Sequence, residues 1–121
     1  MNYMIDKFDK AKYKMVAEQI ANQLDEDKAS DIITIDLEDR TDIAFYMVVA
    51  TGRSSRHVTS IANKLIDIKR EEIPRGVGME GMETGQWVLI DFGGVIVHIF
   101  QHEARDLYRI EDLWDMKPTG K

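Results

Sequence analysis

The sequence predicts a single α/β domain in which helices flank a mixed sheet. Three observations predict this fold class: two stretches with apolar residues at helical spacing, short β-branched runs between them, and two apolar runs on either side of Gly93-Gly94. A length of 121 residues suits one domain with one core. We expect this domain to occupy residues 1–121, with its core at about 12–114 and flexible ends at 1–11 and 115–121.

The first expected helix spans about residues 12–24, where apolar side chains recur three and four residues apart and form one stripe for burial. A β-branched run at 32–37 is typical of a strand. The nearly continuous apolar run at 46–50 is typical of a strand that is buried on both faces.

A strand-to-helix turn at 51–55 leads into the second expected helix. Ser54 or Ser55 can accept hydrogen bonds from the free N–H groups of its first turn. The apolar residues of this helix begin at Val58 and recur at helical spacing to Ile68, and the helix must end before Pro74. Residues 76–85 hold four of the eight glycines, so we expect an irregular loop there.

The runs at 87–92 and 95–100 predict a β-hairpin, because Gly93-Gly94 can supply the positive φ angles of a two-residue turn. One face of this hairpin is entirely apolar and is assigned to the core; it pairs Phe92 with Val95, Ile90 with Val97 and Val88 with Ile99. The other face is mixed; it pairs Asp91 with Ile96, Leu89 with His98 and Trp87 with Phe100. This mixed face is either covered by the one or two short helices expected at 103–114 or offered to a partner.

Composition excludes several classes of function. Sixteen Lys and Arg against twenty-two Asp and Glu give a net charge of −6, which argues against broad binding of nucleic-acid phosphates. Without Cys the chain has no disulfide, thiolate nucleophile or Cys-ligated metal. No apolar run approaches the roughly twenty residues that cross a bilayer. Residues 1–14 lack a signal-peptide core, so we expect a cytoplasmic protein.

Three sequence patterns suggest a cofactor, nucleotide or metal site, but each lacks the neighbouring residues or elements that such a site needs. Residues 76–81 match G-x-G-x-x-G, but they follow a helix and precede a strand, the reverse of a dinucleotide site. Residues 51–57 gather N–H groups, hydroxyls and two arginines, yet Asp36, Glu38 and Asp91 form no D-x-D pair that would hold metals for nucleotidyl transfer. His98 and His102 on one strand would lie about 13 Å apart, too far for one ion. We therefore expect no cofactor and no metal.

Several segments, taken in order, are specific as a set although each alone is weak. They are residues 31–36, 46–52, 54–58, 78–81, 87–93 and 95–100, followed by Tyr108 and Leu113-Trp114. Together they resemble the ribosomal silencing factors, the Iojap-like proteins of bacteria and organelles, over about residues 16–114. The chain departs from this family where it has Phe45 in place of a common acidic residue and Gly94 in place of a common Asp.

The resemblance implies a fold similar to that of nucleotidyltransferases without their catalytic carboxylates, and no enzyme activity. It implies binding to the large ribosomal subunit through its ribosomal protein fourteen, which blocks joining of the small subunit and represses translation under starvation or in stationary phase. It also implies a set of partner-binding residues: Trp87 and Tyr108, with Leu89, His98, Phe100 and Leu107 as their neighbours.

We expect little or no direct contact with RNA, and whether Arg53 and Arg56 touch ribosomal RNA stays open. Two alternatives also remain. One is a nucleotidyltransferase-like enzyme that binds a nucleotide at residues 51–57. The other is a self-associating structural module, or a homodimer of the free protein, that uses the same apolar patch.

Overall fold

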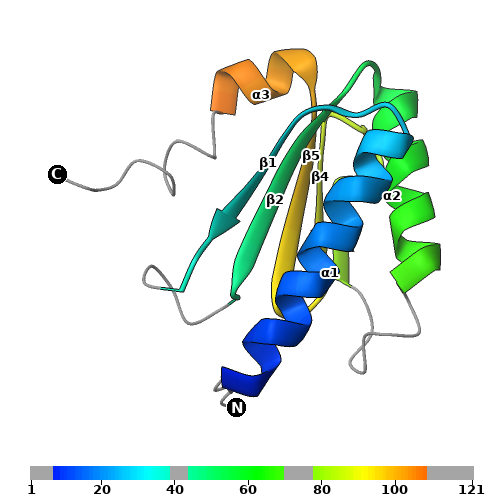
Figure 1. Ribbon diagram of the computed structural model, residues 1–121. Helices are drawn as coiled ribbons and strands as arrows, with labels where there is room; N and C mark the ends of the chain where they lie inside the picture. The colour runs from blue at the N-terminus through cyan, green and yellow to red at the C-terminus, as the bar shows by residue number, and fades with distance from the viewer. Residues whose placement is uncertain (1–6, 39–43, 70–77, 109–121) are drawn as a thin grey trace, which may run out of the picture.

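Residues 7–38, 44–69 and 78–108 are described by the computed structural model (Figure 1). Along these segments the elements follow in the order α1 (Lys7–Glu26), β1 (Ser30–Asp36), β2 (Tyr46–Gly52), α2 (Ser55–Lys69), β3 (Gly78–Glu80), β4 (Trp87–Asp91), β5 (Val95–Gln101) and α3 (His102–Tyr108). Helices α1 and α2 lie side by side on one face of the sheet, and α3 lies at one end of it (Figure 1). The prediction of an α/β domain with a mixed sheet and flanking helices is confirmed. No helix in these segments combines the length and the apolar character needed to cross a membrane.

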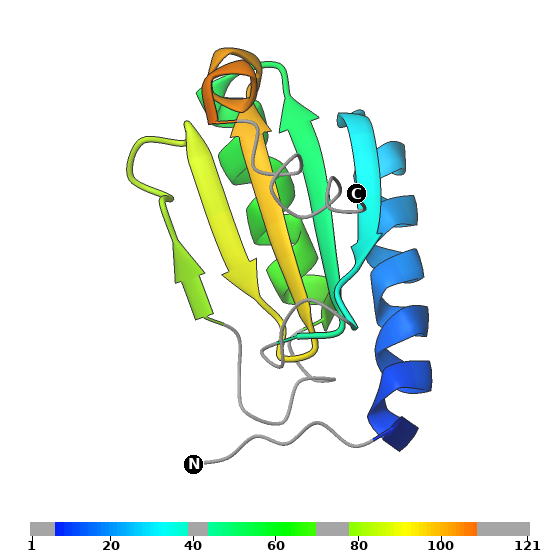
Figure 2. The same ribbon diagram turned by 90° about the vertical axis from the view of Figure 1, so that its left-hand side faces the viewer.

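Five strands form the sheet in the spatial order β1-β2-β5-β4-β3, which Figure 2 shows from the side opposite α2. At its centre, β2 (Tyr46–Gly52) and β5 (Val95–Gln101) are parallel. The outer strands β1 (Ser30–Asp36), β4 (Trp87–Asp91) and β3 (Gly78–Glu80) pair antiparallel with their neighbours. The predicted strands at 32–37 and 46–50 are confirmed, with ends shifted by one or two residues.

Strand β3 corrects one expectation. The prediction of an irregular loop over 76–85 is wrong at residues 78–80, where Met79 pairs with Ile90 and Glu80 with Leu89. The Gly-Met-Glu sequence contains no β-branched or aromatic residue, so its local propensity gives no strand signal. This strand forms because β4 offers an unpaired edge, which is a tertiary contact.

Both predicted helices are present, and they cover one face of the sheet. α2 (Ser55–Lys69) is capped by Ser54, whose Oγ accepts a hydrogen bond from the backbone N–H of His57 at 3.1 Å. α1 (Lys7–Glu26) begins well before the expected residue 12. Together with the inward side chains of the strands, the two helices form the main core; its members include Val16, Ile20, Leu24, Val58, Leu65, Val88, Ile90, Val97 and Ile99.

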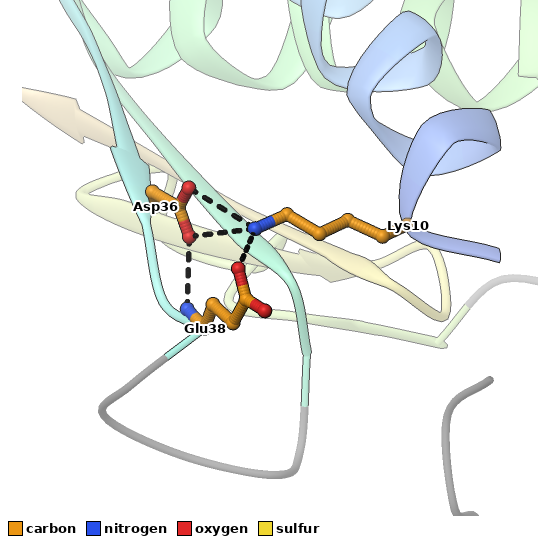
Figure 3. A network of polar contacts seen from close by, with 3 residues as sticks. All are labelled: Lys10, Asp36 and Glu38. Atoms are coloured by element: carbon orange, nitrogen blue, oxygen red, sulfur yellow. Dashed lines mark hydrogen bonds and ion pairs between the residues drawn. The ribbon is translucent and has the colours of Figure 1, made fainter. Parts of the chain in front are cut away.

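A polar network anchors the early part of α1 to the end of β1 (Figure 3). Lys10 Nζ forms ion pairs with Asp36 at 3.3 Å and with Glu38, and it lies 5.6 Å from the centre of the Tyr46 ring. The hydrogen bond to Glu38 is the largest effect that raises the pKa of Lys10 above its ordinary value. These carboxylates are distant from Lys10 in sequence, so the helical pattern could not predict how early α1 begins.

The hairpin forms with the predicted register. Val88 pairs with Ile99 and Ile90 with Val97 on the core face, and the turn closes with a hydrogen bond of 2.9 Å from the Phe92 N–H to the Val95 carbonyl. Of the two turn glycines, Gly93 alone has a positive φ, at 91°. The expectation of two positive angles is therefore wrong, and one positive φ at the first central residue is the pattern of a type II′ turn.

Gly94 is required for space rather than for its backbone angles. A Cβ on Gly94 would lie 2.4 Å from Cγ and Cδ2 of the Tyr13 ring. The same ring packs against Phe45, with 6.0 Å between the ring centroids. The two positions at which the chain departs from the family pattern, Phe45 and Gly94, therefore meet at one tyrosine of α1. Phe45 itself is buried, so the start of β2 lacks the surface polarity that an acidic residue would give it.

We expect Gly94→Ala to lower the free energy of unfolding by about 1–3 kcal/mol, because the new methyl group overlaps the Tyr13 ring. Urea denaturation measures this loss. Gly78→Ala is the matched control, since its Cβ would meet only Asp91 at an ordinary 3.6 Å. Adding Tyr13→Ala should make the combined loss smaller than the sum of the single losses. Additive losses would contradict the steric explanation.

Candidate functional site

The strand side chains that point away from α1 and α2 form what is here called the outer face, which Figure 2 presents to the viewer. Its members, across the sheet, are Ile35, Met47, Val49, Ile96, His98, Phe100, Trp87 and Leu89. At one end of the sheet, Ala104 of α3 (His102–Tyr108) packs against this face. The outer face is thus a second, smaller apolar cluster.

The outer face is buried at its centre, and it is partly open towards β4 and at Ile96 of β5. Phe100 is 0% exposed and His98 is 3% exposed, whereas Trp87 and Leu89 are half-buried. Of the predicted partner-binding residues, the structure thus brings these four together. The other two, Leu107 and Tyr108, belong to α3, and their side chains lie outside the described part of the structure. That all six bind a partner stays a prediction.

Trp87 is held by two neighbours on β5. Its ring stacks on Phe100 with 4.9 Å between centroids, and its Nε1 donates a hydrogen bond of 2.9 Å to Nδ1 of His98. In the antiparallel pairing Trp87 lies directly opposite Phe100, so His98 is its diagonal neighbour. An aromatic side chain with one open edge and one satisfied polar atom is typical of interface residues.

His98 accepts this hydrogen bond in its neutral form. Burial lowers the pKa of His98 to about 4, from an ordinary value of 6.5. Because an indole N–H can only donate, Nδ1 of His98 must be the unprotonated nitrogen, and the proton of the neutral ring is assigned to Nε2. Near pH 7 the site is therefore uncharged at its centre.

Acidic side chains lie beside the open part of the outer face. Asp91 follows Trp87 and Leu89 on the same side of β4, and Glu80 of β3 pairs directly with Leu89. Both carboxylates are exposed. The half-buried apolar pair Trp87 and Leu89 is thus bordered by negative charge, which suits a positively charged partner.

The turn at residues 51–57 is mainly a structural device. The Arg53 N–H donates a hydrogen bond of 2.9 Å to Nδ1 of His57, and Nε2 of His57 donates to the Asp27 carbonyl at 2.8 Å. His57 thereby ties the start of α2 to the end of α1. The predicted Ser54 cap is confirmed, and it uses one of the donors that an anion would need. Arg53 and Arg56 are exposed beside this turn.

The three carboxylates considered for metal binding do not converge. Asp36 and Glu38 pair with Lys10, and Asp91 Oδ1 accepts a hydrogen bond of 2.8 Å from the Gly93 N–H. Asp36 ends β1 and Asp91 ends β4, with two strands between them, so they are about 14 Å apart by strand spacing. Within residues 7–38, 44–69 and 78–108, no group of three or more His, Cys, Asp or Glu could hold a metal ion.

Arg105 of α3 was not predicted from the sequence. It is buried, and its Nη1 donates hydrogen bonds to Thr51 Oγ1 at 2.7 Å and to the carbonyl of Asp31. Asp31 has a φ of 50° at a bulge in β1, which helps to turn its carbonyl out of the regular pairing. Arg105 therefore fastens α3, the helix that carries Leu107 and Tyr108, to the ends of β1 and β2. A single arginine in a polar stretch gives no sequence signal of this role.

Comparisons with known proteins agree on one family. Residues 10–121 match the family model described as ribosomal silencing factor during starvation. Ribosomal silencing factor RsfS of Zymomonas mobilis is 41% identical over 101 residues, which cover 84% of this chain and 76% of that protein. A crystal structure of a protein from Chromobacterium violaceum superposes with a TM-score of 0.78 at 38% identity and covers 88% of this chain and 89% of that one. A more distant relative, at 26% identity, is the Mus musculus protein named mitochondrial assembly of ribosomal large subunit protein 1, of which the chain covers 47%.

Proposed function

Because this chain belongs to the family of ribosomal silencing factors, we propose that it represses translation by occupying the large ribosomal subunit. It binds there through ribosomal protein fourteen and sterically blocks joining of the small subunit when nutrients fall. The family match over residues 10–121 is the observation that carries this proposal. The name of the mouse relative, which refers to assembly of the large subunit, supports the choice of subunit.

The open part of the outer face is the proposed docking surface. Trp87 and Leu89 contact the partner directly, since they are half-buried whereas His98 and Phe100, the other predicted residues with a described side chain, are buried. Leu107 and Tyr108 extend the surface onto α3. A partly exposed tryptophan on a rigid strand is well suited to dominate an interface, because it brings a large area at a small cost in side-chain entropy.

Charge supports a basic partner such as a ribosomal protein. The chain has a net charge of −6, and Glu80 and Asp91 lie beside the docking surface. Such rim charges mainly accelerate encounter and set orientation. Steric occupancy of the subunit needs neither catalysis nor a cofactor, and it places the protein in the cytoplasm with the ribosomes. RNA contact is not needed for affinity in this scheme.

We expect the wild-type protein to suppress subunit joining, followed by light scattering with purified small and large subunits. Leu89→Arg should weaken this inhibition at least tenfold, about 1.4 kcal/mol, because it places a charge in the apolar contact and opposes a basic partner. Ile68→Arg is the matched control: Ile68 is 45% exposed on α2, and this helix covers the opposite face of the sheet (Figure 1). It should inhibit like wild type.

Normal joining at saturating wild-type protein would overturn the proposed function. Equal loss of inhibition in Leu89→Arg and Ile68→Arg would overturn the docking surface alone. Trp87→Ala should also release the block, but it removes the contacts with Phe100 and His98 as well. Its melting temperature must therefore be measured beside its activity.

A further inference from the structure

Building on the proposed docking surface, we infer that His98 is a positioning residue that fixes the orientation of the Trp87 indole. The sequence alone grouped His98 with the residues that touch the partner. In the structure His98 is 3% exposed, so it has almost no surface to offer. Its Nδ1 instead accepts the Trp87 Nε1–H at 2.9 Å, and it acts on the partner through Trp87.

The hydrogen bond selects one of two orientations that stacking alone would leave open. The indole stacks on Phe100 at 4.9 Å, and stacking is compatible with either face of the indole. The torsion that turns an aromatic ring about its last single bond is broad and roughly two-fold, so the side chain has two ring positions to choose between. Only one of them brings Nε1 to His98, because a hydrogen bond requires a short distance and near-linear geometry.

The selected orientation determines what the partner meets. With Nε1–H directed at a buried acceptor, the indole presents hydrocarbon rather than a hydrogen-bond donor at the docking surface. The group that packs on Trp87 must therefore be an apolar side chain or the aliphatic stem of a basic one, not a carbonyl or carboxylate. The acidic residues Glu80 and Asp91 beside it suit the charged end of such a stem.

Burial also keeps His98 in the form that this role needs. A protonated imidazole donates from both nitrogens and would repel the indole N–H. Since burial disfavours the charged form, Nδ1 stays available as an acceptor at the pH of the cytoplasm. No ion pair with another described residue is needed to maintain this state.

The spectroscopic test requires no partner. The chain has two tryptophans, so a ¹H–¹⁵N spectrum contains two indole signals, and Trp87→Phe identifies that of Trp87. In His98→Phe, which keeps a ring but lacks the acceptor, the Trp87 indole N–H should exchange with solvent about tenfold faster. His98→Asn places an amide oxygen near the position of Nδ1 and should restore slow exchange. In wild type, Nδ1 of His98 must be unprotonated; a protonated Nδ1 would overturn the inference without any variant.

The binding test separates positioning from a general loss of stability. Affinity for the purified large subunit should fall about tenfold in His98→Phe, or 1.4 kcal/mol, and recover in His98→Asn. In the Trp87→Phe background, His98→Phe should cause no further loss, because the residue that His98 positions is already gone. A full additional loss there would show that His98 acts independently of Trp87 and would overturn the inference. If wild type fails to bind the subunit, the proposed function falls, and the exchange rates still decide whether His98 holds the indole.

Discussion

Val97→Asp should leave the protein unfolded under conditions in which wild type is folded. Val97 is 0% exposed on β5, between β2 and β4, and it faces the core under α1 and α2. An unpaired carboxylate at this place costs several kcal/mol, a large part of the roughly 5–15 kcal/mol by which domains are stable. Far-UV circular dichroism and the dispersion of amide signals in a ¹H–¹⁵N spectrum measure the outcome.

Ile96→Asp is the matched control for this prediction. Ile96 is the preceding residue on the same strand, but it points to the outer face and is only half-buried. Its carboxylate can keep much of its hydration, so we expect a folded protein with reduced stability. A folded Val97→Asp beside an unfolded Ile96→Asp would mean that the two faces of the hairpin are assigned the wrong way round.

The second large effect is a loss of stability with falling pH that originates at His98. The pKa of His98 is about 4 in the folded protein and about 6.5 in the unfolded chain, so the unfolded state binds the proton first. His98 therefore leaves stability unaffected above pH 6.5 and reduces it as pH falls towards 4. Because the unfolded chain binds one proton at His98 that the folded protein does not, the free energy of unfolding falls by about 3 kcal/mol between pH 6.5 and pH 4. Urea denaturation at a series of pH values measures the slope.

His98→Asn should remove this slope while it keeps the hydrogen bond to Trp87. The measurement belongs between pH 6.5 and about 4.5, because carboxylates add their own effect at lower pH. Asp27 is one of these. Desolvation raises its pKa, but the hydrogen bonds from Lys64 and Gln23 and the positive charge of Lys64 act together against it, and the net effect is a lowered pKa. The ionised Asp27 stabilises the fold at pH values above 3.8, the ordinary pKa of an aspartate. This stabilisation is lost only as the pH falls below 3.8. An unchanged slope in His98→Asn would contradict the assignment.

The predictions that succeeded rest on short-range patterns. The β-branched and apolar runs predicted β1 and β2, and a serine followed by apolar residues at helical spacing predicted the cap and course of α2. The hairpin register followed from the two-residue turn and the alternation of side chains, because a shift by one residue would exchange its two faces. The elements that failed or ended elsewhere depend on partners outside their own local pattern: β3 on the edge of β4, and the start of α1 on the carboxylates of Asp36 and Glu38.

The candidate site divides in the same way. Alternation placed Trp87, Leu89, His98 and Phe100 on one face of the hairpin, and the structure confirms that they share it. The alternation of side chains could not predict which of these four residues are exposed, because exposure depends on what α3 and the neighbouring strands cover. His98 and Phe100 are buried, so they contact Trp87 rather than a partner. Arg105 holds α3 in place through its hydrogen bond to Thr51, a residue far away in the sequence.

The amino-acid sequence alone thus determined the class of fold and the faces of the strands, because periodicity, caps and turns depend on a few neighbouring residues. It also determined the family, because the motifs follow one another along the chain. Tertiary packing decided that Gly94 must be small and that His98 is neutral. It also decided that Trp87 and Leu89 keep open surface while His98 and Phe100, on the same face of the hairpin, are buried. Steric overlap, desolvation and coverage are properties of groups brought together from distant positions, and they exist only once the chain has folded.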